Sequence, residues 1–171
     1  MGSLSPEEPD FGVVQLGFRY RFTATLHNGN CPSLERVRFR IAPDARSAPA
    51  PATARDVVRG ERSAIRCATT PGMLAAGIGA PITLELWAAA PGPVHCAFQI
   101  VLTSERSADQ ILVLQARARV LEPARFMQHA RNRRRAGLAG VLEDGVRAVG
   151  KLPPPRAAAP PAAARLSLIH I

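Results

Sequence analysis

The sequence contains little lysine, few aromatic residues, few cysteines and no long apolar run. Only Lys151 among its 22 basic residues is lysine, 5% of its 171 residues are aromatic, and three are cysteine. An odd, sparse set of cysteines does not form a disulfide framework. Without a run of about 18 apolar residues the sequence predicts no transmembrane helix. The first nine residues have no apolar run either, so we expect no signal peptide and a reduced, intracellular environment.

Positive charge is concentrated in the last third of the chain. Residues 1–121 contain 13 arginines and 10 acidic residues, a net charge of +3, and residues 122–171 contain 9 basic and 3 acidic residues, a net charge of +6. An excess of this kind favours an anionic partner, which is nucleic acid, a membrane surface or an acidic protein. The preference for arginine over lysine, beside abundant alanine, proline and glycine, is typical of a GC-rich coding sequence.

Short segments of alternating polar and apolar residues fill residues 9–121. The clearest is 19–26, where every second residue from Tyr20 to Leu26 is apolar, and this period of two is typical of a half-buried strand. We predict strands at 11–16, 19–26, 35–41, 63–68, 81–87, 94–103 and 111–120. Seven to eight strands with one polar face each predict an all-β, immunoglobulin-like β-sandwich.

The segments outside these strands have other compositions. We predict a disordered lead at 1–8, a low-complexity loop at 43–55, a weak helical and basic extension at 122–152, and a proline- and alanine-rich linker at 153–171. The last six residues, 166–171, break the composition abruptly. They equal one translation of CTGTCTCTTATACACATC, a sequencing-adapter end. We therefore favour an adapter artefact over a natural apolar tail, and expect the natural chain to continue.

No pattern in the chain is typical of catalysis or metal binding. There is no Gly-x-Ser-x-Gly, and the pair Gly77 and Gly79 does not lead from a strand into a helix. No two cysteines have metal-ligand spacing, so Cys31, Cys67 and Cys96 are interpreted as small buried apolar residues. We expect no enzymatic activity, no cofactor, no metal and no small-molecule substrate.

Two groups of arginines are candidates for contact with an anionic partner. If the strands at 19–26 and 35–41 are antiparallel neighbours, their arginines form one basic stripe on the outer face of a sheet, and the extension contributes a compact run. The two groups are Arg19, Arg21, Arg36, Arg38 and Arg40, and Arg131, Arg133, Arg134 and Arg135. Plain solvation remains the alternative for both groups. Trp87, opposite the apolar face of its strand, either caps the edge of the core or marks a partner surface.

Residues 9–121 resemble the ASH domain of the wider major-sperm-protein and PapD-like group. Pro9 stands where the family usually has leucine, and Asn30 where it has glycine. The motifs that carry the resemblance are Asp10-Phe11-Gly12-x-Val14-x-x-Gly17, Leu26-x-Asn28, Arg38-Phe39-x-Ile41, Leu74-Ala75-Ala76-Gly77 and the closing strand at 111–120.

The resemblance implies a non-enzymatic structural or interaction module of a ciliary, axonemal or centrosomal assembly, similar to the ASH domains of Hydin-type proteins of the motile-cilium central apparatus. It implies a cytoskeletal location, above all the axoneme, and protein partners such as tubulin. Two alternatives stay open. One is an adaptor of the major-sperm-protein type that binds short peptide motifs at a membrane contact, and the other is nucleic-acid binding through the basic extension.

Overall fold

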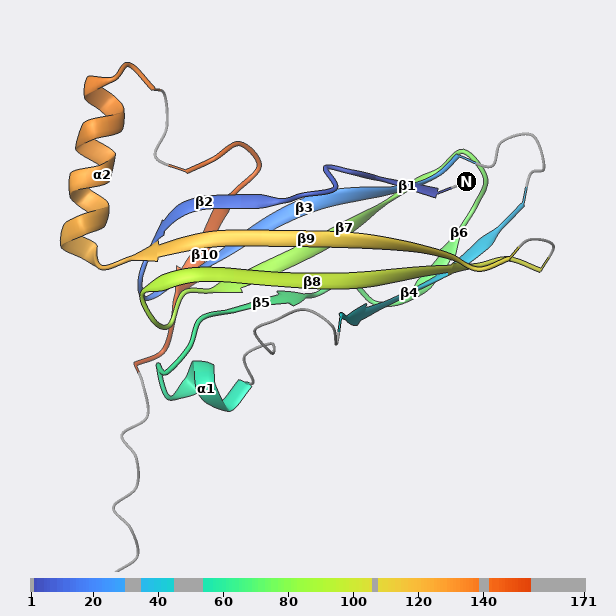
Figure 1. The fold of residues 1–171 in the computed structure, drawn as a ribbon, viewed down its shortest axis with the longest axis horizontal. Helices are drawn as coiled ribbons and strands as arrows, with labels where there is room; N and C mark the ends of the chain where they lie inside the picture. Colours follow the sequence, from blue (N-terminus) through green and yellow to red (C-terminus); the bar gives the residue numbers. More distant parts are fainter. Residues whose placement is uncertain (1, 30–34, 45–53, 106–107, 139–141, 155–171) are drawn as a thin grey trace, which may run out of the picture.

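Two five-stranded sheets enclose one core in the computed structural model, which describes residues 2–29, 35–44, 54–105, 108–138 and 142–154 (Figure 1). Sheet A has the order β1-β3-β7-β5, with β10 also paired to β3, and sheet B has the order β2-β9-β8-β4-β6. The strands are β1 (Gly2–Ser5), β2 (Asp10–Gln15), β3 (Phe18–Asn28), β4 (Val37–Pro43), β5 (Ala64–Cys67), β6 (Gly72–Leu74), β7 (Gly79–Trp87), β8 (Gly92–Thr103), β9 (Gln110–Leu121) and β10 (Arg147–Lys151). This is the predicted all-β sandwich.

The core is built from the alternation that the sequence shows. In β3 the side chains from Tyr20 to Leu26 that point inward are buried, and β3 pairs with β7 from Arg19 opposite Trp87 to His27 opposite Gly79. The seven predicted strands correspond to β2, β3, β4, β5, β7, β8 and β9. Each large apolar side chain buried in this way contributes about 1.5–3 kcal/mol.

Asn28 is a buried polar residue at the end of β3, with 1% of its surface exposed. Its Nδ2 donates to the carbonyl oxygen of Glu35 at 2.9 Å and to that of Leu74 at 3.3 Å. These bonds connect the end of β3 to the segment before β4 and to β6. The asparagine of the Leu26-x-Asn28 motif therefore holds both sheets together at one end of the sandwich.

The Asp10-Phe11-Gly12 motif forms the start of β2, which runs parallel to β9. Asp10 accepts hydrogen bonds from the Gly12 amide and from Arg117 Nε, each at 2.7 Å. Gly12 has φ of 64° at the irregularity in this pairing, and a Cβ there would collide with Cγ of Glu143. Glycine is needed at this position both for its backbone conformation and for its lack of a side chain.

Both flanks of the predicted sandwich differ from expectation. Residues 2–5 of the predicted disordered lead form β1, which pairs with the Asn28 end of β3 and buries Leu4. The extension is only partly the weak helix that was predicted. After α2 (Pro123–Arg135) the chain returns to sheet A as β10, where Val146 is buried and Gly150 takes a positive φ.

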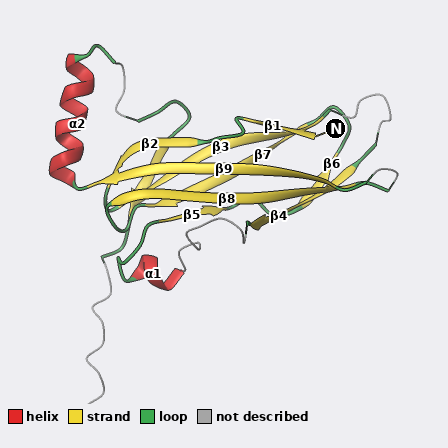
Figure 2. Ribbon diagram, viewed as in Figure 1, coloured by secondary structure: helices red, strands yellow, loops and turns green. Residues whose placement is uncertain are grey.

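Two further elements were not expected from the sequence. β6 lies between the strands predicted at 63–68 and 81–87, where no strand was predicted, and the short helix α1 (Ala54–Val58) begins at the end of the loop predicted at 43–55 (Figure 2). Most of that loop, Asn30 and Cys31 lie outside the described residues. So do residues 155–171 of the predicted linker, including the last six residues.

We predict that Asn28→Ala lowers the free energy of unfolding by about 1–3 kcal/mol, because the buried carbonyl group of Leu74 and the partly buried one of Glu35 lose their donor. Urea unfolding of the full chain measures this. The matched control is His27→Ala, one residue away on the exposed face of the same strand, which should change stability by about 0.5 kcal/mol or less. Equal losses in the two variants would contradict this role for Asn28.

Candidate partner-binding surfaces

The predicted single stripe of arginines is wrong, because its two strands belong to different sheets. β3 lies in sheet A and β4 in sheet B. Arg19 and Arg21 are therefore on the outer face of sheet A, whereas Arg38 and Arg40 are exposed on the outer face of sheet B, with Arg36 just before β4. A period of two indicates which residues point outward, but not which strands are neighbours.

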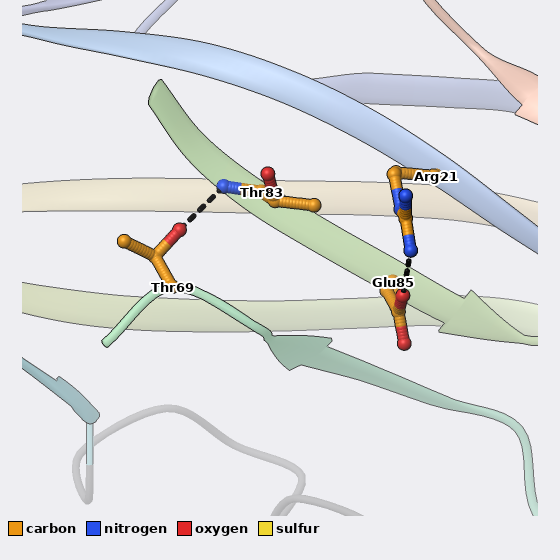
Figure 3. Close-up of polar contacts among 4 residues, drawn as sticks. All are labelled: Arg21, Thr69, Thr83 and Glu85. Carbon is orange, nitrogen blue, oxygen red and sulfur yellow. Dashed lines mark hydrogen bonds and ion pairs between the residues drawn. The ribbon is translucent and has the colours of Figure 1, made fainter. Parts of the chain in front are cut away.

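The outer face of sheet A gathers arginines from three strands into one cross-strand row. Residues directly opposite each other on antiparallel strands share a face, and the register places Arg147 of β10 opposite Arg21 of β3, Arg21 opposite Glu85 of β7, and Glu85 opposite Arg66 of β5. Arg21 Nη2 is 2.7 Å from Glu85 Oε1 (Figure 3). The row thus contains three arginines and one carboxylate, which leaves it with a net positive charge.

Trp87 lies beside this row, and the guanidinium groups of two arginines lie over its indole ring. The Arg66 guanidinium carbon is 4.8 Å from the indole centroid, and that of Arg19 is 6.0 Å away. A cation over an indole ring at this distance is attracted by the negative face of the ring. The indole therefore holds both guanidinium groups near the outer surface of the sheet. We call Arg19, Arg21, Arg66, Arg147 and Trp87 the arginine face.

The segment after β5 is held against β7 by a side-chain bond, which keeps Arg66 in place. Thr69 Oγ1 accepts a hydrogen bond from the Thr83 amide at 2.7 Å (Figure 3) and donates to the Pro81 carbonyl at 3.3 Å. The threonine hydroxyl thus continues the pairing of β5 and β7 beyond Cys67. Strand β5, which contains Arg66, is therefore held to β7 beyond the last residue of its ladder, Cys67.

The outer face of sheet B has a different character. Arg40 pairs with Val101, and Val101 pairs with Ile111, which is 60% exposed. Arg36, Arg38 and Arg40 have no recorded ion pair within the described part of the chain. This face combines unpaired arginines with exposed aliphatic side chains, and it lacks an aromatic platform like Trp87.

The run of four arginines in α2 is likewise not one surface. Arg133 Nη1 is 2.7 Å from Glu143 Oε1, and its side chain is only 19% exposed. Arg131 and Arg134 line a groove of about 520 Å³ between α2 and the ends of β2 and β3. Arg135 is exposed at the end of the helix and does not line the groove. The helical period separates residues that are adjacent in sequence.

The two described thiols, Cys67 and Cys96, both have raised pKa values. Burial raises the pKa of both the Cys67 and the Cys96 thiol, whereas a catalytic cysteine needs a lowered pKa. Among the described residues, no group of three histidine, cysteine or acidic side chains is arranged to hold a metal ion. The same part of the chain has no helix that combines the length and apolarity needed to cross a bilayer.

Arg66 and Arg147 were not among the candidates from the sequence. Each is separated from the other candidate arginines in the chain, and only strand pairing brings them to Arg21 and Glu85. The alternation around 64–67 is too short to assign β5 to a sheet, and β10 gives no periodic signal. No local pattern identifies these two residues.

Comparison with known proteins finds the fold but no close relative. No family model matches the chain, and no curated protein matches it in sequence. The ASH/PapD-like domain 7 of human CEP192 is similar over 71% of this chain and 85% of that chain, with a TM-score of 0.55 at 11% identity. WR4, a major-sperm-protein family member of C. elegans, also matches, over 71% of this chain and 98% of that chain, with a TM-score of 0.42 at 9% identity. The likeness to the CEP192 domain confirms the ASH/PapD-like fold that the motifs indicate.

We predict that Arg66→Ala shifts the fluorescence of Trp87 to longer wavelength and increases its quenching by acrylamide, because the nearer guanidinium no longer covers the ring. Trp87 is the single tryptophan of the chain, so the signal is unambiguous. Loss of the cation–π contact should also lower stability by about 0.5–1 kcal/mol. Arg40→Ala on sheet B is the control and should leave the emission unchanged. Unchanged emission in Arg66→Ala would contradict this contact.

Proposed function

We propose that this chain is a non-enzymatic interaction module that docks onto an acidic protein surface in a microtubule-based assembly of the ciliary or centrosomal kind. The main observation behind the proposal is the arginine face, where a row of three arginines contains one carboxylate, which is paired with Arg21, and two arginines lie over Trp87. The resemblance to ASH domains supports it, because that resemblance implies a module of such an assembly.

The physical form of the arginine face suits a broad protein contact. Its cations are spread over several strands of a sheet surface and are not gathered around a cavity. Complementary charge of this kind accelerates encounter and selects partners, and it is weakened by salt. Arginine and tryptophan are also the residues that contribute most at the centres of protein interfaces. Tubulin, whose surface is acidic, is the partner that we favour.

The absence of enzymatic activity is part of the proposal. The described thiols have raised pKa values. A binding role explains the exposed arginines without any reactive group.

The test is co-sedimentation of the full chain with polymerised microtubules across a salt series. One variant combines Arg21→Ala, Arg66→Ala and Arg147→Ala, which removes three charges from sheet A. The matched control combines Arg36→Ala, Arg38→Ala and Arg40→Ala, which removes the same charge from sheet B. Near physiological salt we expect at least a tenfold loss of affinity in the first variant and about twofold or less in the control. Salt screens distant charges, so only arginines that directly face acidic groups of the partner contribute strongly.

Equal losses in the two variants would indicate attraction by net charge alone and would contradict a specific face. No binding by the unmodified chain would exclude microtubules as the partner. A steep salt dependence on RNA or DNA in place of microtubules would favour nucleic-acid binding. Trp87 gives a second readout, since a polyglutamate peptide has no aromatic residue and should alter the emission on binding to the arginine face.

A further inference from the structure

Contacts among Gly12, Glu143 and Arg133 set the position of α2 against the sandwich. Gly12 of β2 leaves space for the side chain of Glu143, which forms an ion pair with Arg133 of α2 at 2.7 Å. Ala130, one turn before, is buried, and Phe126, another turn before, is half-buried. α2 is thereby held beside the end of the sandwich through one stripe of its surface (Figure 1), and the groove lies next to that stripe.

Most residues that line the groove are apolar, and the polar ones are Gln15, Tyr20, Arg131 and Arg134. Its walls are formed mainly by Phe18, Tyr20, Phe126, Met127 and Leu142. Its charged lining residues, Arg131 and Arg134, are both exposed, and within the described residues neither has a recorded ion pair. The neighbouring Arg133 is engaged with Glu143. An apolar floor with positive charge on one side fits a partner that is apolar and acidic.

The spacing of the lining residues on α2 follows the helix axis. Met127, Arg131 and Arg134 lie at i, i+4 and i+7, which places them along one stripe of the helix. Arg131 and Arg134 are about 4.5 Å apart along the axis, at 1.5 Å per residue. Acidic residues one turn apart on a second helix have this spacing, whereas alternate residues of an extended strand lie about 6.6 Å apart. Met127 is 52% exposed at this stripe, where an apolar side chain of a partner would cover it.

We propose that this groove binds an amphipathic helix of a partner protein. Its apolar stripe lies against Met127 and the aromatic walls, and acidic residues one turn apart pair with Arg131 and Arg134. This inference goes beyond the contact proposed for the arginine face and stands independently of it, because the groove is formed by α2, β10 and the ends of β2 and β3.

A partner protein explains the groove better than a lipid does. Gln15, whose side chain is a primary amide, is among the residues that line the groove. An amide can donate to and accept from polar groups of a peptide, whereas an acyl chain has none to offer.

The test uses fluorescence anisotropy of a dye-labelled synthetic helical peptide, acetylated and amidated, with leucines at heptad spacing and glutamates one turn apart beside them. The full chain should bind it. Arg131→Glu combined with Arg134→Glu should weaken binding at least tenfold, by like-charge repulsion. Ala148→Phe, which fills the groove from β10 without a change in charge, should weaken binding to a similar degree. Trp87 emission should not change when the peptide binds.

The matched control combines Arg125→Glu with Arg135→Glu, which makes the same change of charge at exposed positions of α2 that do not line the groove. It should weaken binding about twofold or less. Equal weakening in the control, undiminished binding by Ala148→Phe, or equally tight binding of a scrambled peptide without an apolar stripe would overturn the proposal. Failure of the peptide to bind, together with binding to phosphatidylserine vesicles that the Arg131/Arg134 variant loses, would assign the groove to a membrane.

Discussion

The pairing of β3 is the constraint on which the rest of the structure depends. One edge of β3 is bonded to β7 from residue 19 to residue 27, and the other edge is bonded to β1 and β10. A slip of one residue would exchange the inward row from Tyr20 to Leu26 for the outward row that contains Arg21. The same register therefore buries the core and builds the arginine face. Neither can change without the other.

The sandwich could be predicted from the sequence because its strands carry a strong signal. The longer of the predicted strands, β3, β4, β7, β8 and β9, alternate over enough residues to show a period of two, and all seven predicted strands are present. β1 has four residues with one buried, and β6 has three, so neither contains a period that can be detected. β10 combines a positive-φ glycine and an irregular register with no inward apolar row, and its place beside β3 depends on tertiary contacts around Val146.

The candidate surfaces could be predicted only in part. Alternation correctly placed Arg19 and Arg21 on an outer face, but sheet membership is a long-range property, and Arg38 and Arg40 lie on the opposite sheet. Arg66 and Arg147 join the face only through strand pairing. On α2 the sequence suggested one surface where the structure has several, because residues adjacent in sequence point in different directions around a helix. Arg133 forms an ion pair with Glu143, whereas Arg131 and Arg134 line the groove.

The sharing of one edge of β3 by β1 and β10 has a mechanical consequence. β1 begins at the Asn28 end of β3 and β10 ends at its Phe18 end, so the chain enters at one end of the sandwich and leaves at the other (Figure 1). A pulling force applied through both flanks acts along β1 and β10. It loads the hydrogen bonds of each ladder together in shear, and does not peel them open one after another. Extension along β3 would therefore have to break each of these two ladders as a whole.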